Sequence, residues 1–384
     1  MGVYYFPVRI VSEDGCLKSL GDEVIRLDAR HPLVVTDPGI AKTGILEKVT
    51  EPLKEKGMPY AIFQGVEPDP KMRNVTAAVE VVKQGNHDLL IGLGGGSSID
   101  TAKATAMLSV NGGDIREYQG IRDRYPQKPL PLIGIPTTAG TGSEISSSSV
   151  IIDEEKKYKM FLKSPQIFAQ VAFLDAGVLA GIPNPIAAST GADALTHALE
   201  SYFCPNRTYF SEAFSLRAID LIFKNLRAFV ANTRNRERAQ KMLNASCLAG
   251  IGMTTASLGL VHALAHPVGV AGRISHGMAC ALLLPHVLRF NWLADSERFE
   301  SLALAMDWTT RCDCPSERDI AWRVIESVET LLSDIGIPKH LSEINVTLKN
   351  IKPLAEEAFK NFLNQINPRQ TTQEQVEEIL SKVI

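Results

Sequence analysis

Five histidines lie in one quarter of the 384-residue chain, among Ala, Leu and Gly: His197, His262, His266, His276 and His286. Asp193 precedes His197 by four residues, and His262 and His266 repeat this spacing, which places each pair on one face of a helix. Either pair alone is more typical of hydrogen-bonded core histidines or of helix-surface contacts. Together they favour a divalent metal site, because burying so many titratable groups without a shared task costs roughly several kcal/mol.

A glycine-rich loop, Gly94-Gly95-Gly96-Ser97-Ser98, follows the apolar run 88–93 and precedes a helical pattern that extends to residue 107. Glycines let the backbone approach a ligand closely, and the N–H groups and positive dipole end at a helix start suit a phosphate. The loop is neither a G-x-G-x-x-G motif nor a P-loop, and a tight turn without a ligand is the alternative. Ser97 and Asp100 have the spacing of a capping box.

A second loop, Thr137-Thr138-Ala139-Gly140-Thr141-Gly142, follows the strand-like run 130–135. Two such loops at the C-terminal ends of strands suit a dinucleotide in the crevice between them. Asp37 ends the earlier strand-like run 32–36. An acidic side chain there can accept hydrogen bonds from an adenosine ribose diol and repel a 2′-phosphate, although a helix N-cap or turn is an equally good interpretation of Asp37.

Strand-like and helical patterns alternate through the first half of the chain. Strand candidates at 32–36, 59–63, 88–93 and 130–135 are separated by helix candidates, among them 42–56 and 74–84. This order predicts a mostly parallel sheet with helices on both faces.

Strand signals fade at Gly181-Ile182-Pro183-Asn184-Pro185, and helical periodicity follows, with apolar residues at 216, 219, 223, 226 and 230. We therefore expect an α/β domain over residues 1–182 and an all-helical domain over residues 183–384. The last helix is expected to begin at a capping box of Thr371 and Glu374.

Composition restricts the partners and the compartment. The net charge is −3 without a basic block, which argues against nucleic acid or an anionic membrane as the main partner. No apolar run reaches the length of a membrane span, and the N-terminus lacks a signal-peptide pattern. The six cysteines are scattered, and Cys312 and Cys314 are too close for an ordinary zinc knuckle. We therefore expect reduced thiols in a cytoplasmic protein.

The chain resembles the iron-containing (group III) metal-dependent alcohol dehydrogenases, near the lactaldehyde reductases and propanediol dehydrogenases. The resemblance covers essentially the whole chain and is carried by the glycine-rich loop with Asp100 and Lys103 and by segments 136–144, 191–197 and 262–277. It implies an N-terminal Rossmann-like α/β domain plus an all-α C-terminal domain, an architecture shared with dehydroquinate synthases. It also suggests a homodimer or a larger homo-oligomer.

The resemblance implies a site for NAD and a divalent metal. The metal, usually Fe²⁺ and with Zn²⁺ as the alternative, would be held by Asp193, His197, His262 and His276. His266 would lie near the nicotinamide and substrate. NAD(H) would contact a longer set of residues, which consists of Asp37, Gly94, Gly95, Gly96, Ser97, Ser98, Thr137, Thr138, Thr141 and, at the ribose, Lys159.

The implied reaction is hydride transfer between NAD(H) and a small primary alcohol or its aldehyde. The metal lowers the pKa of the alcohol and polarises the aldehyde carbonyl, while the nicotinamide carries the hydride. His266 either relays the hydroxyl proton or orients cofactor and substrate.

Two departures from the family pattern leave the substrate open. Arg273 precedes His276 where relatives often carry an aromatic residue and Pro, and the run Ser146–Ser149 replaces bulkier residues. Arg273 would suit a carboxylate or sulfonate on the substrate, although a surface arginine is the more ordinary interpretation. The alternatives are therefore a reductase specific for an anionic aldehyde of the hydroxybutyrate or sulfoacetaldehyde type, a dehydroquinate synthase-like lyase, and a non-catalytic binding module.

Overall fold

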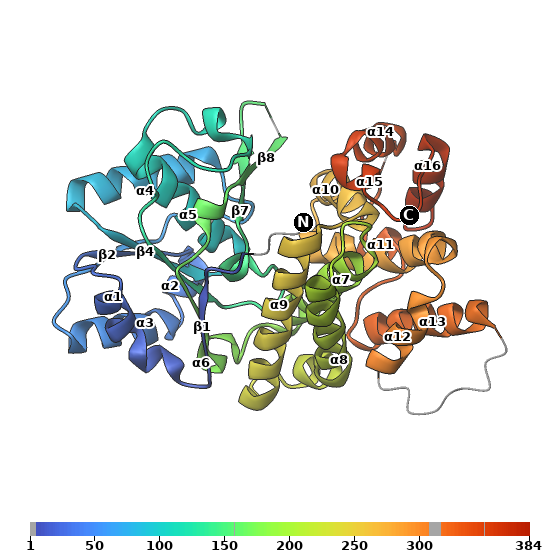
Figure 1. Ribbon diagram of the computed structural model, residues 1–384, viewed down its shortest axis with the longest axis horizontal. Coiled ribbons are helices and arrows are strands. Elements are labelled where there is room, and N and C mark those ends of the chain that lie inside the picture. The colour runs from blue at the N-terminus through green and yellow to red at the C-terminus, as the bar shows by residue number, and fades with distance from the viewer. Residues whose placement is uncertain (1–4, 157, 307–315, 349) are drawn as a thin grey trace. The chain divides into compact units, whose positions relative to one another are not determined.

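The chain divides into two compact units in a computed structural model, which describes residues 5–156, 158–306, 316–348 and 350–384 (Figure 1). Unit 1 comprises Met1–Ala180 and unit 2 comprises Gly181–Ile384. Each unit has its own architecture and is described by itself. Cys312 and Cys314 lie outside the described residues.

Unit 1 is built on a six-stranded sheet in the order β1-β9-β6-β4-β2-β3, and all neighbouring strands are parallel. The strands are β1 (Arg9–Ser12), β2 (Pro32–Val35), β3 (Ala61–Phe63), β4 (Leu89–Gly94), β6 (Leu132–Pro136) and β9 (Val171–Leu174). The helices are α1 (Leu20–Arg26), α2 (Pro38–Ala41), α3 (Ile45–Glu55), α4 (Met72–Gly85), α5 (Gly96–Asn111) and α6 (Ala176–Leu179). The parallel α/β prediction is confirmed, although the short strands β1 and β9 were not predicted.

The strand order reverses between β2 and β4. From β2 the chain continues to β3 on one side, and from β4 it continues to β6 on the other side. Val35 pairs with Gly92, so the residues that follow β2 are level with the end of β4. Parallel sheets bind ligands outside the carboxyl ends of the strands at such a reversal. The fold therefore brings the end of β2 and the glycine-rich loop to the position that suits a cofactor.

A second, three-stranded sheet is attached to α5. Its strands β5 (Gly120–Ile121), β7 (Ser148–Asp153) and β8 (Tyr158–Lys163) have the order β5-β8-β7. Asp100 Oδ2 accepts a hydrogen bond from Val150 N at 2.9 Å. The capping box of Ser97 and Asp100 was therefore a wrong prediction: α5 follows Gly95 without a side-chain cap, and Asp100 is used to hold β7.

Lys103 on α5 is completely buried. Its Nζ donates to the carbonyls of Ser146 and Ser148, at 2.7 and 2.8 Å, which fixes the start of β7. Burial lowers the pKa of Lys103 to about 8, against the opposing effect of Asp100 and Glu144. The lysine thus replaces the strand partner that these carbonyls would otherwise need.

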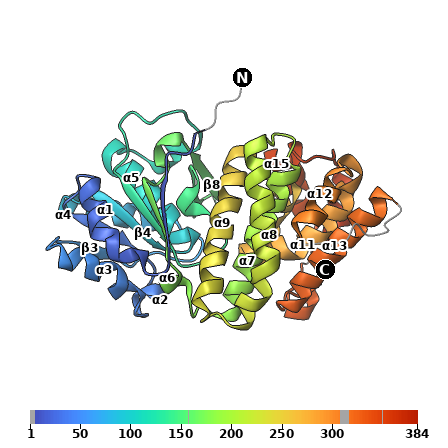
Figure 2. The same cartoon turned by 60° about the horizontal axis from the view of Figure 1, so that its bottom comes forward.

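Unit 2 is helical in its described residues. Its helices are α7 (Asn184–Phe203), α8 (Tyr209–Ala231), α9 (Arg236–Ala256), α10 (Leu260–Gly272), α11 (His276–Asn291), α12 (Arg298–Ala305), α13 (Glu317–Asp334), α14 (Lys352–Lys360), α15 (Phe362–Gln365) and α16 (Gln373–Ser381). Figures 1 and 2 show α7, α8 and α9 side by side. The helix predicted from the apolar period at 216–230 is α8. The predicted cap of the last helix is wrong by one residue, because Thr372 and Gln375 form the capping box.

One helical segment, His276–Ala294, is long and apolar enough by composition to cross a membrane. In the described part of the chain, 61% of this segment is buried inside the fold. The core helix of a folded domain has the same composition, so this segment is weak evidence for a membrane span.

We expect Lys103→Met to destabilise unit 1. Methionine has a similar length but leaves two buried carbonyls and the Asp100 carboxylate without their cation, a type of loss that costs about 3–5 kcal/mol. The thermal midpoint should fall by roughly 10 °C, measured by circular dichroism. Lys83→Met, on the exposed face of α4, is the matched control and should leave the midpoint within a degree or two. An unchanged midpoint for Lys103→Met would contradict this role.

Candidate metal and cofactor sites

Three helices of unit 2 bring the predicted metal ligands together. Asp193 and His197 lie four residues apart on α7, His262 lies on α10, and His276 begins α11. Asp193 Oδ1 is 3.7 Å from the Nε2 atoms of His197 and His276 and 3.9 Å from that of His262. The side chain of His276 is 30% exposed, whereas those of the other three residues are almost fully buried, so the cluster opens beside His276.

The geometry of this cluster fits a metal ion better than it fits hydrogen bonds. Within the described residues, the buried Asp193 Oδ1 has no hydrogen-bond partner. Separations of 3.7–3.9 Å are too long for N–H···O bonds. Two ligand atoms that are each about 2.1 Å from one tetrahedral ion lie about 3.4 Å apart, close to these values. The donor set, three imidazoles and one carboxylate, is also one that Fe²⁺ and Zn²⁺ accept.

The pKa shifts of Asp193 and His262 favour the protonation states that bind a cation. Burial by itself raises the pKa of Asp193, but His197, His276 and His262 together lower it below its ordinary value. Burial lowers the pKa of His262 well below its ordinary value. An ionised carboxylate and a neutral imidazole are the forms that bind a metal.

Glu200 orients the His262 ring through its Nδ1 atom, on the side away from Nε2. It lies on α7 one turn beyond His197, its Oε2 accepts a hydrogen bond from His262 Nδ1 at 2.5 Å, and its Oε1 accepts one from Val261 N at 2.6 Å. The first contact leaves Nε2 of His262 as the ligand atom, as carboxylates behind metal-binding histidines commonly do. Burial raises the pKa of Glu200 to about 7, against the opposing backbone N–H groups of Val261 and Gly259.

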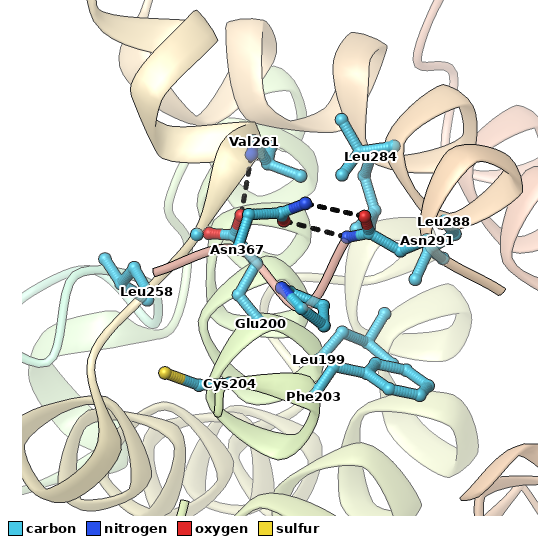
Figure 3. Close-up of a pocket in the computed structure, with 13 residues that line it drawn as sticks. Leu199, Glu200, Phe203, Cys204, Leu258, Val261, Leu284, Leu288, Asn291 and Asn367 are labelled. Atoms are coloured by element: carbon cyan, nitrogen blue, oxygen red, sulfur yellow. Dashed lines mark hydrogen bonds between the residues drawn. The ribbon is translucent and has the colours of Figure 1, made fainter. Parts of the chain in front are cut away.

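The start of α10 is supported by side chains from elsewhere in unit 2. Gly259 provides no side-chain cap. Asn367, which follows α15, accepts a hydrogen bond from Leu260 N at 3.4 Å and exchanges two hydrogen bonds with Asn291. Figure 3 shows this Asn pair and the contact of Glu200 with Val261 around an otherwise apolar pocket. The first turn of α10, which carries His262, is thus held by Glu200 and Asn367 in place of a local cap.

Close helix packing requires glycine at the start of α11. A Cβ added to Gly277 would lie 2.3 Å from the carbonyl oxygen of Ser189 and 3.2 Å from Cβ of Asp193. Similarly, a Cβ on Gly191 would lie 2.2 Å from a methyl group of Leu226 on α8. These two glycines let α7 approach its neighbours closely enough for Asp193 to lie beside His276.

Of the other unit 2 residues that the sequence singled out, His266 lies beside the cluster. The ring of His266 lies 5.4 Å from that of His276 and 6.4 Å from that of His262, between their centroids. Arg273 is exposed at the end of α10 in a left-handed conformation (φ 52°). His286 lies further along α11, where burial lowers its pKa.

The loops of unit 1 meet at the reversal of strand order. Asp37 is the N-cap of α2, since its Oδ1 accepts hydrogen bonds from Gly39 N and Ile40 N at 2.8 and 3.0 Å. Gly94 has φ 146°, and a Cβ there would lie 2.5 Å from Ser98 Oγ and 3.3 Å from Asp37 Oδ2. Asp37 is therefore a helix N-cap, one of the two interpretations that the sequence left open. Its second carboxylate oxygen, Oδ2, faces the glycine-rich loop.

The threonine loop lies against the same place. A Cβ on Gly96 would lie 2.8 Å from Cγ2 of Thr141, and one on Gly95 would lie 3.5 Å from Thr138. Thr137 N donates to Gly94 O at 2.9 Å. Lys159 lies apart on β8, where its Nζ pairs with Asp69 at 2.9 Å. The structure thus brings the predicted loop residues together, and it shows Lys159 in an ion pair with Asp69.

The chain matches known proteins along nearly its whole length. Residues 7–176 match the profile of iron-containing alcohol dehydrogenases, and residues 187–384 match the C-terminal profile of the Fe-containing alcohol dehydrogenase family. The chain belongs to the iron-containing alcohol dehydrogenase family. It is therefore an oxidoreductase that acts on CH–OH groups and interconverts alcohols and aldehydes in a metal- and NAD(H)-dependent reaction, not a dehydroquinate synthase-like lyase or a non-catalytic module.

Individual dehydrogenases of the family are similar over almost all of the chain. The NAD-dependent methanol dehydrogenase of Bacillus methanolicus is 36% identical over 99% of this chain and 99% of its own length. The lactaldehyde reductase of Escherichia coli (strain K12) is 36% identical over 95% of both chains. The crystal structure of a 1,3-propanediol oxidoreductase is 34% identical and superimposes over 100% of both chains with a TM-score of 0.96.

The sequence analysis did not single out two side chains that lie near the candidate metal ligands. The sequence around Glu200 has the pattern of an ordinary amphipathic helix. Only its position one turn after His197 indicated that it lies near the candidate metal site. Cys280 appeared as one of several scattered thiols, although it follows His276 by four residues. In both cases the helical spacing that identified Asp193 was the available signal.

Replacing Glu200 tests its effect on the metal site of this dehydrogenase. Glu200→Gln keeps the size of the side chain but removes the carboxylate that accepts from His262. We expect the affinity for a divalent metal to fall about 10–100-fold, measured by competition with a chelating dye. Glu237→Gln, at an exposed position on α9, should retain the unmodified affinity. Equal affinities for the two variants would mean that Glu200 does not orient the ligand.

Proposed function

We propose that this dehydrogenase converts small primary alcohols and their aldehydes, and that Asp193, His197, His262 and His276 hold its metal. The observation that supports this most strongly is the buried Asp193 Oδ1, which has no hydrogen-bond partner in the described chain and has three imidazole nitrogens 3.7–3.9 Å away. The ion, Fe²⁺ or alternatively Zn²⁺, supplies Lewis-acid chemistry that polarises an alcohol or aldehyde oxygen. Residues 1–182 would then form the dinucleotide-binding domain and residues 183–384 the metal-binding domain.

The chain's own groups would divide the remaining tasks. Asp193 supplies the negative charge that balances the ion, and Glu200 keeps Nε2 of His262 directed to it. His266, whose ring lies 5.4 Å from that of His276, would carry the hydroxyl proton or orient the substrate. The open side of the cluster at His276 would admit the substrate.

NAD(H), when bound, supplies the hydride chemistry. The N-terminus of α5 and the loop Gly94-Gly95-Gly96-Ser97-Ser98 would bind its diphosphate, with Thr137, Thr138 and Thr141 beside them. Asp37 Oδ2 would accept the ribose hydroxyls. Lys159 would reach the ribose only by leaving Asp69, its partner in the structure.

We also infer that the enzyme works in the cytoplasm as a homodimer or a larger homo-oligomer. The scattered cysteines are typical of a compartment that keeps thiols reduced. The edge strand β1 carries an exposed Ile10 and offers a pairing edge to a second copy.

Turnover in defined metals tests the metal assignment. The protein is purified anaerobically, loaded with Fe²⁺ or Zn²⁺ and followed by NADH absorbance with short-chain aldehydes, lactaldehyde, succinic semialdehyde and a sulfonated aldehyde. We expect neutral aldehydes to be reduced and Asp193→Ala and His262→Ala to lose about a thousandfold in kcat/KM, since the Lewis acid is worth several kcal/mol. His31→Ala, at an exposed position of unit 1, is the control.

Three outcomes would change this conclusion. Absence of NADH consumption with both metals would contradict the proposed function, and full activity of Asp193→Ala would contradict the metal site. Reduction confined to the charged aldehydes would instead favour the specificity for an anionic substrate that Arg273 suggests, and Arg273→Ala should then abolish the preference.

The choice between NAD and NADP tests Asp37. Asp37→Ser keeps a side-chain oxygen to cap α2 but removes the charge that would repel a 2′-phosphate. We expect the ratio of kcat/KM with NADPH to that with NADH to rise at least about tenfold, or 1.4 kcal/mol. Asp114→Ser is the matched control, because Asp114 also caps a short helix through Arg116 N. A ratio that does not change would leave Asp37 as a helix cap only.

A further inference from the structure

Cys280 lies inside the cluster of metal-binding side chains. It is one helical turn after His276 on α11 and is completely buried. Its Sγ is 3.6 Å from His276 Nε2 and 3.9 Å from His262 Nε2. The ligand atoms of Asp193, His262, His276 and Cys280 all lie within 4.8 Å of one another. The thiol is thus about as close to His276 Nε2 as the Asp193 carboxylate is, at 3.6 against 3.7 Å.

These separations have two physical explanations. A thiol can share its hydrogen with an imidazole, or thiolate and imidazole can bind the same ion. For an ion about 2.3 Å from sulfur and 2.1 Å from nitrogen, a tetrahedral angle separates the two ligand atoms by about 3.6 Å. The observed 3.6 and 3.9 Å fit either arrangement, so the other groups of the cluster decide between them.

Asp193 provides an independent reason to place an ion there. Its Oδ1 is buried at 2% residue exposure and, among the described residues, makes no hydrogen bond, although it faces the same space as the thiol. The Cys280 thiol also reaches the Asp193 side chain, but its single proton can serve only one of these acceptors at a time. One cation between Asp193, His262, His276 and the sulfur contacts all four groups, whose ligand atoms lie within 4.8 Å of one another.

We propose that Cys280 Sγ is an additional protein ligand of this metal site, beside the Asp and His ligands, and that the thiolate shifts the preference of the site from iron to zinc. Thiolates are soft ligands that favour Zn²⁺, and zinc accepts a fifth ligand. The inference rests on the metal site of the proposed function. It concerns the protein without substrate; the sulfur itself is buried, so the exposed side of His276 stays accessible to the substrate.

Cobalt spectroscopy tests this ligand directly. The full-length protein is loaded anaerobically with Co²⁺, whose visible d–d bands report metal binding and whose near-ultraviolet charge-transfer band reports a thiolate ligand. We expect both signals in the unmodified protein, and only the d–d bands in Cys280→Ser. Cys204→Ser is the matched control, because Cys204 is also buried and its Sγ donates to Ala256 O, so both signals should remain.

Zinc measurements keep the test independent of the variant's folding. X-ray absorption of the unmodified zinc protein should show a sulfur scatterer at about 2.3 Å. If Cys280→Ser folds, its zinc affinity should fall roughly 10–100-fold, with a smaller loss of Fe²⁺ affinity in the same competition.

The results separate this inference from the metal site on which it rests. Cobalt d–d bands without a charge-transfer band, or zinc without a sulfur neighbour, would overturn the role of Cys280 and leave the Asp and His ligands in place. A protein that binds neither cobalt nor zinc would overturn both, and NADH turnover would then show whether the enzyme works by another site.

Discussion

The constraint on which unit 2 depends is the burial of one carboxylate. Asp193 Oδ1 lies in the interior without a hydrogen bond from the described residues, so its charge must be balanced by something other than the protein backbone. Three helices deliver imidazoles to within 4 Å of it. This convergence requires backbones to come close, which explains why Gly277 and Gly191 occupy positions where a Cβ would overlap a neighbour. The close packing of these helices and the ability of the cluster to bind a metal therefore depend on the same residues.

A supporting network extends from this carboxylate to the C-terminal part of the chain. Glu200 fixes the tautomer of His262 and accepts a hydrogen bond from Val261 N in the first turn of α10. Asn367 accepts one from the preceding residue, Leu260. Asn367 is itself paired with Asn291 at the end of α11. Because α10 has no side-chain cap of its own, the position of the candidate ligand His262 depends on Glu200, 62 positions earlier, and on Asn367, which contacts Leu260 across 107 positions. Asn367, which follows α15, therefore supports the site although it is not a candidate ligand.

The sequence predicted those features that depend on local spacing. The i, i+4 pairs on apolar helices pointed to Asp193 and the histidines that the structure brings together. The alternation of strands and helices pointed to the two loops, whose meeting at Asp37 and Gly94 follows from the register of β2 and β4. Spacing offered a signal for Glu200, one turn after His197, but not for its contact with His262, which is 62 residues away. The cap of the last helix was predicted wrongly for a different reason, because Thr371 with Glu374 and Thr372 with Gln375 are overlapping versions of one pattern. In the structure Thr371 Oγ1 donates to Asn364 Oδ1 at 2.8 Å, and Thr372 caps the helix.

The glycine-rich motif shows that neighbouring residues of one motif can serve different purposes. Gly94, Gly95 and Gly96 keep space beside Asp37 and the threonine loop, where an added Cβ would meet side chains. Asp100 and Lys103, on the following helix, turn away to β7 and hold its backbone. A lysine buried this completely is expensive unless each of its protons is bonded, and its three contacts to Ser146 and Ser148 meet that requirement. The motif therefore combines a loop that would face the ligand with two side chains, Asp100 and Lys103, that hold β7 from inside the fold. These side chains connect the Ser146–Ser149 run to α5, the helix that begins at the proposed diphosphate site.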